Sequence, residues 1–266
     1  MKRICIQVTN KNRWGELGCL LTGLLNQTYN AWDIVILDEN DTSLDQCEFI
    51  QKLLNLIRLK NHGVQVIKNT LKIGVCNARN KLLEESNYNN IDYVARIDDD
   101  VIPEPDYLEK LVEVIELGYD IASGVTPLAF TPSPIRKTEW FDSPIINRKD
   151  INEKGEITYY GDDCGVLYDK EVIIEAHEFR SSCLMKLEVA KKIRYPTNLS
   201  PVGFREEFFF SFKAMKEGYK IGVNTSAIIW HLQTSSGGCR HPNYAELVKS
   251  DNEYFYKWVR ENYANN

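Results

Sequence analysis

The first 120 residues alternate short apolar runs with segments of helical periodicity, and this alternation constrains the fold more than any other feature. The apolar runs predict strands at residues 4–8, 32–37, 64–67 and 93–97. The segments with helical spacing predict helices at residues 14–26, 45–60, 74–87 and 105–117. Repeated strand–helix units form a mostly parallel sheet that is covered by helices. The sequence therefore predicts an α/β fold whose ligand lies beyond the carboxyl ends of the strands.

The fourth predicted strand ends in three consecutive carboxylates, Asp98, Asp99 and Asp100. Three adjacent like charges in a partly buried cleft are costly unless a cation compensates them. Oxygen ligands favour Mg²⁺ or Mn²⁺, so the triplet predicts a divalent-cation site. Because alternate residues of an extended segment point to the same side, Asp98 and Asp100 would face one metal–diphosphate unit while Asp99 points away. The competing interpretation is a solvated turn before a proline-containing loop.

The pattern changes beyond residue 121. Residues 130–161 are rich in Pro, Asn, Lys and Asp without clear periodicity, which predicts a long loop or a hairpin over the site. Strands are predicted at residues 179–185 and 220–223, with a further segment at 227–231 and helices at 188–192, 206–217 and 244–263. No internal repeat or low-complexity linker interrupts the chain, so we expect one domain.

Composition excludes several classes of protein. The 32 basic and 38 acidic residues give a net charge of −6, so the surface as a whole offers no electrostatic case for nucleic acid binding. No stretch approaches ~18 consecutive apolar residues, and the amino terminus runs directly into a strand without a signal-peptide core. Seven scattered cysteines without a C-x-x-C pair suit a reducing compartment and argue against a zinc site. We expect a soluble, cytoplasmic protein without a transmembrane segment.

Several spaced features together resemble the family 2 glycosyltransferases of the GT-A fold over nearly the whole chain. They are residues 8–13, 24–29, 34–40, Gly74 with residues 78–80, residues 98–100, Glu206 with Glu207 ahead of Gly218, and His231 ahead of Gly237 and Gly238. One departure is Val8, where the family often has Pro. The resemblance implies a single Rossmann-like GT-A domain over residues 1–266, with a mostly parallel central sheet and a smaller acceptor-side subregion. Residues 1–120 would bind the nucleotide sugar, and residues 121–266 would supply the acceptor side and a C-terminal helix.

The resemblance also implies a set of nucleotide-binding residues. Thr9 and Asp38 would border the base, with Asp38 accepting a hydrogen bond from it. Arg79 would lie near the base or the phosphates, and Asp98 would hold the ribose or the donor sugar. The alternatives are that Asp38 is a turn residue at the end of a strand and that Arg79 is a surface charge. Three further residues belong to the expected nucleotide-binding set: Asn10, Arg13 and Asp99.

The resemblance also implies that two residues bind a divalent metal. Asp100 would coordinate Mn²⁺ or Mg²⁺ that bridges the diphosphate, and His231 matches a late histidine that can complete the site. A neutral imidazole can bind a borderline metal such as Mn²⁺. The alternative is that His231, which follows an apolar strand, is a hydrogen-bonded core residue.

Glu206 and Glu207 are the candidates for the catalytic base. In an inverting displacement the base lies on the face opposite to the leaving group, so it must come from an element distant in sequence from the acidic triplet. Glu207 is the first candidate. The family usually shows Glu-Asp at this point, so Glu206 stays open as the alternative. Carboxylates that merely charge the first turn of the following helix are the competing interpretation.

These features favour a metal-dependent, inverting glycosyltransferase. The donor would be a nucleoside diphosphate sugar, with UDP as the nucleotide, and the acceptor a hydroxyl on a glycan, a lipid-linked molecule or another glycoconjugate, as in polysaccharide biosynthesis. One alternative is a catalytically silent subunit that binds a sugar nucleotide or a glycan. Another is a sugar-phosphate nucleotidyltransferase, which should carry a Gly-rich phosphate loop after the first strand. Residues 9–13 contain no glycine, which argues against it.

Overall fold

The computed structural model describes residues 1–71, 73–132, 135–138, 152–154, 156, 165–179 and 181–264. The first four strands coincide closely with those predicted and lie in one sheet: β1 (Ile4–Asn10), β2 (Trp32–Asp38), β3 (Val64–Lys68) and β4 (Tyr93–Arg96). The other strands of this sheet are β5 (Val101–Pro103), β6 (Ile121–Val125), β9 (Ile173–Ala176), β10 (Cys183–Lys186) and β11 (Ile221–His231). Their order is β3-β2-β1-β4-β10-β6-β11-β5, and β9 pairs with β11 outside this path.

The sheet is mostly parallel, as predicted. Strands β3, β2, β1 and β4 pair in parallel, and β11 pairs in parallel with β6. Strand β10 runs antiparallel between β4 and β6, so β6 again points in the direction of β4. The carboxyl ends of β1, β4, β6 and β11 therefore face the same edge of the sheet.

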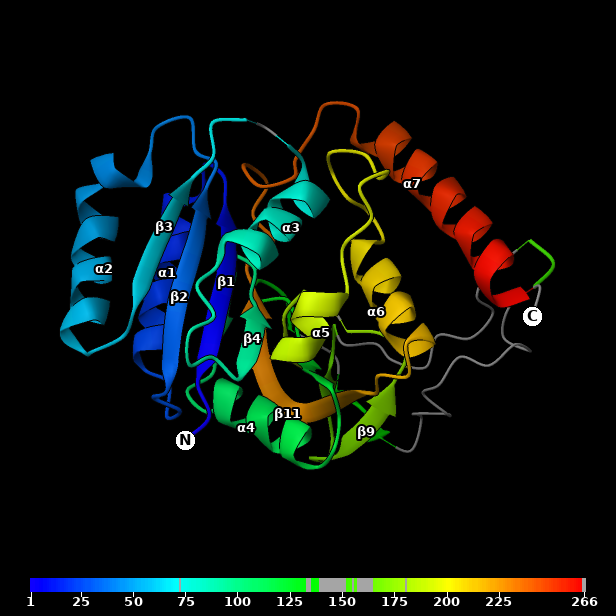
Figure 1. Cartoon of the computed structure of the whole chain (residues 1–266), viewed down its shortest axis with the longest axis horizontal. Helices are drawn as coiled ribbons and strands as arrows, with labels where there is room; N and C mark the ends of the chain where they lie inside the picture. The colour runs from blue at the N-terminus through cyan, green and yellow to red at the C-terminus, as the bar shows by residue number, and fades with distance from the viewer. Residues whose placement is uncertain are drawn as a thin grey trace.

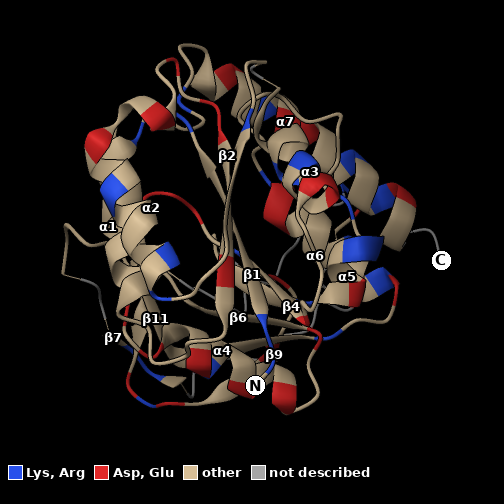
Figure 2. Ribbon diagram, turned by 60° about the vertical axis from the view of Figure 1, so that its left-hand side comes forward, with Lys and Arg blue, Asp and Glu red and all other residues tan. Residues whose placement is uncertain are grey.

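Helices cover both faces of the sheet, as Figure 2 shows from its edge. One face carries α1 (Trp14–Leu25), α2 (Glu48–Leu59) and α4 (Tyr107–Glu116), whose buried apolar side chains form one core cluster with β1 and β2. The other face carries α3 (Val75–Glu85), α5 (Leu187–Lys192) and α6 (Glu206–Lys216), which bury a second set of apolar side chains. Burial on both faces explains why the strands are continuously apolar and do not alternate.

The last helix, α7 (Tyr244–Val259), packs on α6 through aromatic rings (Figure 1). Phe255 lies at the centre, with its ring centroid 5.1 Å from that of Phe209 and 5.8 Å from that of Phe212. Both contacts are edge-to-face, the arrangement that aromatic pairs prefer. The phenylalanine-rich segment of α6 is thus core, and it holds α7 beside the loop that leads into α6.

Several local features differ from the sequence predictions. The predicted helix at residues 45–60 divides into a 3-10 turn (Leu44–Gln46) and α2, because Cys47 between them is extended. Residues 220–223 and 227–231 belong to one strand, β11, whose register shifts between Val223 and Ile228. Strands β5 and β9 were not predicted, and neither was the parallel pair β7 (Ile135–Arg136) and β8 (Leu167–Tyr168). Most of the loop predicted at residues 130–161 lies outside the described residues.

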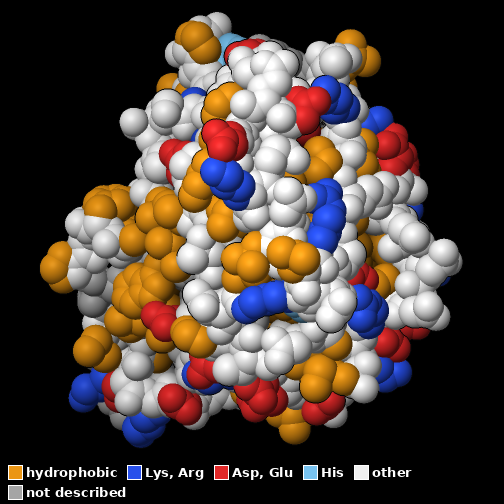
Figure 3. Space-filling model, turned by 90° about the vertical axis from the view of Figure 1, so that its left-hand side faces the viewer, with side chains coloured by type: hydrophobic (Ala, Val, Ile, Leu, Met, Phe, Trp, Pro, Cys, Tyr) orange, Lys and Arg blue, Asp and Glu red, His pale blue; other side chains and the backbone are white. Residues whose placement is uncertain are grey.

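The sheet ends on one side at β3, beside α2. Figure 3 shows this side of the molecule, where hydrophobic side chains lie among charged ones. Leu59 of α2 and Val66 of β3 are among the exposed apolar side chains. None of the described helices combines the length and the hydropathy needed to cross a membrane.

Candidate active site

A cavity of about 630 Å³ opens at the edge of the sheet where the parallel strands end. Thr9 near the end of β1, the triplet after β4 and His231 at the end of β11 line it. The opposite wall comes from residues 201–208, which lead into α6. This volume is typical of a site for a small molecule or a cofactor. The cavity therefore lies where strand–helix alternation predicts the ligand.

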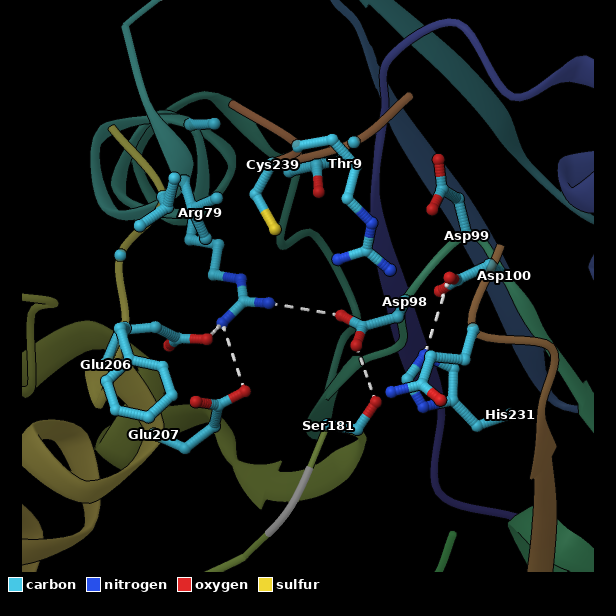
Figure 4. Close-up of a pocket in the computed structure, with 18 of the residues that line it drawn as sticks. Thr9, Arg79, Asp98, Asp99, Asp100, Ser181, Glu206, Glu207, His231 and Cys239 are labelled. Atoms are coloured by element: carbon cyan, nitrogen blue, oxygen red, sulfur yellow. Dashed lines mark hydrogen bonds and ion pairs between the residues drawn. The ribbon is translucent and has the colours of Figure 1, made fainter. Parts of the chain in front are cut away.

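Asp98 is held by two arginines and a serine, of which Figure 4 shows Arg79 and Ser181. Its Oδ1 accepts hydrogen bonds from Arg79 Nη2 at 3.1 Å and Arg96 Nη2 at 3.3 Å, and its Oδ2 accepts one from Ser181 Oγ at 2.5 Å. Burial alone would raise the pKa of Asp98, but the charges of Arg96 and Arg79 outweigh it and lower the pKa. Asp98 is therefore an ionised residue in the middle of the cavity.

Asp99 points to the other side and belongs to a buried network with Arg13 and Asn10. Arg13 Nη1 lies 3.1 Å from Asp99 Oδ1 and 2.9 Å from Asp100 Oδ2, and Asn10 Nδ2 donates to Asp99 Oδ2 at 2.7 Å. Burial raises the pKa of Asp99 to about 7, although the charge of Arg13 opposes this rise. Arg13 thus fixes two of the three carboxylates at the cavity wall.

Asp100 and His231 converge on the cavity from different elements. His231 Nε2 lies 3.4 Å from Asp100 Oδ2, and both residues line the cavity. Burial by itself would lower the pKa of His231, but the hydrogen bond to Asp100 together with the charges of Asp100 and Asp98 outweighs that effect and raises the pKa. The pair places one carboxylate oxygen and one imidazole nitrogen side by side.

The opposite wall carries a buried ionic cluster around Arg96, a residue of β4. Arg96 Nη2 lies 3.1 Å from Glu206 Oε1 and 3.1 Å from Glu207 Oε1. Arg79 Nη1 contacts Glu206 directly and lies 3.8 Å from Glu207 Oε1. The side chain of Glu206 is only 3% exposed, whereas that of Glu207 is 25% exposed. Glu206 is therefore locked between two guanidinium groups, and Glu207 is the carboxylate that solvent and a ligand can reach.

The loop after β11 closes over Arg13. Gly238 N donates to Lys11 O at 2.8 Å, and Arg13 Nε donates to Ser236 O at 2.9 Å. Gly237 has a φ of +71°, and a Cβ there would lie 2.6 Å from Arg13 Cγ. A side chain at this position would therefore be strained and would displace the arginine that holds Asp99 and Asp100.

The sequence profile of glycosyl transferase family 2 matches residues 5–176 of the chain. The chain belongs to glycosyl transferase family 2. The match covers β1 to β6 and the acidic triplet and ends before α6, so the resemblance recognised from the sequence is confirmed. No curated protein sequence matches the chain significantly.

Solved structures of other glycosyltransferases share the fold of this family 2 chain. GalNAc-T7 with UDP, GalNAc and Mn²⁺ superposes with a TM-score of 0.64 at 14% identity, covering 98% of this chain and 55% of that one. A 1–349 fragment of S. aureus TarS in complex with UDP-GlcNAc gives a TM-score of 0.56 at 14% identity, covering 98% and 74%. A longer S. aureus TarS structure gives 0.57 at 16% identity, and this chain spans only 36% of it. At these identities the similarity shows the GT-A-like fold alone.

Most of the residues expected from family 2 meet at the cavity, but two do not. Thr9, Arg13, Arg79 and the triplet line it together with Glu206, Glu207 and His231. Asp38 is buried, and its oxygens accept hydrogen bonds from the Asn40 side chain at 2.6 Å, Ser43 Oγ at 2.7 Å and Leu44 N at 2.9 Å. Asn10 lies behind the triplet through its bond to Asp99. Glu39, the residue after Asp38, is the acidic side chain that lines the cavity at this end.

Three residues of the site were not identified from the sequence. Arg96 could have been noticed, because an arginine within an apolar strand needs a buried partner. Ser181 lies in a short segment with no distinguishing motif. Asp251 lies on α7, where it accepts hydrogen bonds from Ser200 N and Ser200 Oγ, both at 2.7 Å, and from Phe204 N at 2.9 Å. No local pattern connects a helical Asp with a loop that precedes it by about 50 residues.

Proposed function

We propose that this family 2 chain transfers a sugar from a nucleoside diphosphate sugar, with UDP as the nucleotide, to an acceptor hydroxyl with inversion. The observation that carries the proposal is the opposition of two groups across one cavity. Asp100 and His231 lie on one side, Glu207 lies on the other, and Asp98 lies between them (Figure 4). An inverting displacement needs this arrangement, with the leaving group and the base on opposite faces of the reacting sugar.

The donor half of the site is proposed to be formed by residues 1–120, as expected from the sequence. Arg79 and Asp98 form an ion pair at 3.1 Å that faces the cavity, so they could contact the sugar and the phosphates together. The UDP and UDP-GlcNAc present in the TarS and GalNAc-T7 structures support a UDP-sugar as the donor. The carboxylate oxygens of Asp38 accept hydrogen bonds from its own loop. We therefore assign the contact with the nucleotide base to Thr9 and Glu39 at the cavity wall.

Asp100 and His231 fit a divalent metal by the chemistry of their donor atoms. A carboxylate oxygen and an imidazole nitrogen suit Mn²⁺, and the carboxylate also suits Mg²⁺. In the part of the chain that the structure describes, no three or more His, Cys, Asp or Glu side chains are arranged so that they could hold a metal ion together. One or two protein ligands are usual where substrate phosphates complete the coordination. When bound, the metal would supply Lewis-acid neutralisation of the leaving diphosphate.

Glu207 is the proposed base, in preference to Glu206. It would accept the proton of the acceptor hydroxyl as that oxygen bonds to the anomeric carbon and the bond to the diphosphate breaks. Arg96 contacts the Glu207 carboxylate at 3.1 Å and can hold it toward the cavity. Glu206 is buried and contacts both Arg79 and Arg96. It can therefore hold these two arginines in place, but it is not accessible to an acceptor.

The first test is a thermal-shift comparison of UDP, GDP, CDP and TDP, each with and without Mn²⁺. A ligand present at about 100 times its Kd adds about 2.7 kcal/mol of stability. For a chain of this size, that stabilisation raises Tm by about 5–10 °C. We expect the largest increase with UDP and Mn²⁺ together. No increase with any nucleotide would contradict the proposal.

Transfer itself is tested with Glu207→Gln. The amide keeps the shape of the side chain but cannot accept the hydroxyl proton. We expect the variant to bind UDP and Mn²⁺ like the wild type and to lose sugar transfer to acceptor and to water. A wild-type protein that binds the donor without any turnover would instead indicate a catalytically silent binding subunit.

A further inference from the structure

Arg205 has a fixed backbone directly before α6. Its φ is +72°, a left-handed conformation that is unfavourable for a residue with a side chain. Two neighbouring features support this conformation. The Asp251 carboxylate accepts hydrogen bonds from the loop at Ser200 N and Phe204 N, and Gly203 adopts a φ of +63°. The start of the Arg205 side chain is therefore positioned by the loop before any ligand binds.

The guanidinium of Arg205 is held in place by neutral groups. Its Nε donates to Asn252 Oδ1 at 2.9 Å. Its central carbon lies 4.8 Å from the ring centroid of Phe208, 5.1 Å from that of Phe204 and 5.9 Å from that of Phe255. Aromatic faces favour a nearby cation and fix its plane. Among the described residues no Asp or Glu forms an ion pair with it, so both terminal nitrogens remain available as donors.

This lack of a carboxylate partner distinguishes Arg205 from Arg13 and Arg79, which line the same cavity, whereas Arg240 at the cavity donates to Thr234 O at 2.8 Å. Arg13 is paired with Asp99 and Asp100, and Arg79 is paired with Asp98 and Glu206. Arg205 lines the same cavity, and its hydrogen bond and ring contacts are with residues 204–255, on the wall that carries Glu207. A rigid guanidinium that has no counter-ion and lies on the same wall as the proposed catalytic base, Glu207, is suited to bind an anion. Its two terminal nitrogens can donate hydrogen bonds to the two oxygens of a carboxylate or a phosphate.

We propose that Arg205 binds an anionic group, a carboxylate or a phosphate ester, of the acceptor molecule. This inference rests on the proposed function, since the acceptor hydroxyl must reach Glu207 from the same wall. The anion and that hydroxyl would belong to one molecule in one cavity, because Arg205 and Glu207 both line it. The site would thereby select charged acceptors over neutral ones of the same shape.

The experiment measures binding of matched anionic and neutral compounds to the protein saturated with UDP and Mn²⁺, which occupies the donor site. The carboxylate arm compares phenyl β-glucuronide with phenyl β-glucoside. The phosphate arm compares glucose 6-phosphate with glucose. We expect the anionic member of at least one pair to bind about tenfold more tightly, as a charge-assisted bidentate contact predicts. Arg205→Gln should abolish that preference, and Arg205→Lys should retain only part of it.

The matched control is Arg58→Gln, which removes the same charge from the exposed surface of α2. It should leave the preference for anions unchanged, and the Arg205 variants should still bind UDP with Mn²⁺. Equal binding of both members of each pair, or no binding of any, would overturn the inference. Equal weakening of both members in Arg205→Gln would also overturn it, because it would show a structural role alone. Failure of the wild type to bind UDP would instead contradict the proposed function.

Discussion

Replacing Glu206 with glutamine is expected to destabilise the protein substantially, although the change removes a single charge. Glu206 contacts Arg79 and lies 3.1 Å from Arg96, and its side chain is 3% exposed. Glutamine has nearly the same shape but directs an amide group, itself a donor, toward two guanidinium groups. The cost therefore comes from electrostatics in a site that water does not reach, and not from a cavity.

The magnitude follows from the charges that remain. Removing one partner of a buried ion pair costs about 3–5 kcal/mol when a charge is left uncompensated. Here the two arginines face three carboxylates, Asp98, Glu206 and Glu207, so two carboxylates still balance two guanidinium groups in the variant. No guanidinium is left uncompensated, so we expect a loss below that range, about 2 kcal/mol in the free energy of unfolding, from the lost charge-assisted contacts. For a chain of this length that corresponds to a fall in Tm of about 4–8 °C.

Glu207→Gln is the matched control, because it makes the same chemical change one residue along the same helix. The Glu207 side chain is 25% exposed, so water compensates much of the lost interaction. We expect it to cost about 1 kcal/mol or less. The assay is urea unfolding at neutral pH followed by tryptophan fluorescence, with an unchanged m-value as the sign that only stability has changed. A loss for Glu206→Gln no larger than that for Glu207→Gln would refute the assignment of Glu206 as the buried structural partner.

Three further outcomes are expected. Gly237→Ala, whose methyl would lie 2.8 Å from the backbone oxygen of Lys11, should cost about 2–4 kcal/mol in urea unfolding. Gly218→Ala is the control, because Gly218 has a φ of +87° but nothing lies within 4 Å of the added methyl, so it should cost only about 1 kcal/mol. Equal losses of stability in the two variants would contradict the predicted clash at Gly237. Burial lowers the pKa of His62 below 6.5, so the unfolded state takes up a proton at this residue more readily than the folded state does. The free energy of unfolding therefore falls as the pH drops through 6.5. In urea unfolding, His62→Phe should lose less stability than the wild type between about pH 7.5 and 5.5. Asp100→Ala should abolish the Mn²⁺-dependent part of the thermal shift with UDP, and a normal shift would remove Asp100 from the metal site.

The amino-terminal part of the fold could be predicted because its signals are local. Apolar runs and helical spacing define β1 to β4 and the helices between them, and the triplet marks the edge where they end. The position of β10 in the sheet could not be predicted, because a run of four residues does not indicate which strands it pairs with. Its place is set by its antiparallel pairing with β4 and β6. The single strand β11 looked like two segments for a related reason, since its register shift interrupts the apolar pattern.

The site shows the same division between local and long-range information. The triplet, Arg79 and Glu207 were found by residue type and order along the chain. Glu207 was the first candidate from the sequence, with Glu206 open as the alternative, and our proposal of Glu207 rests on burial, which depends on Arg96 in a different element. Asp38 has the right residue type at the end of β2, but the hydrogen bonds of its own loop engage its carboxylate, and this could not be known before the loop was seen.

The position of β10 between β4 and β6 has a consequence for synthesis on the ribosome. Residue 96 of β4 pairs with residue 183 of β10, so β4 keeps an unpaired edge until that later segment has been made. At ~5–20 residues per second, the intervening stretch of about 90 residues takes roughly 4–17 s to synthesise. Helices and hairpins form within microseconds, so the nascent amino-terminal half can be structured long before its open edge is covered. During those seconds the unpaired edge of β4 can pair with other chains, so this is the interval in which a chaperone is most needed.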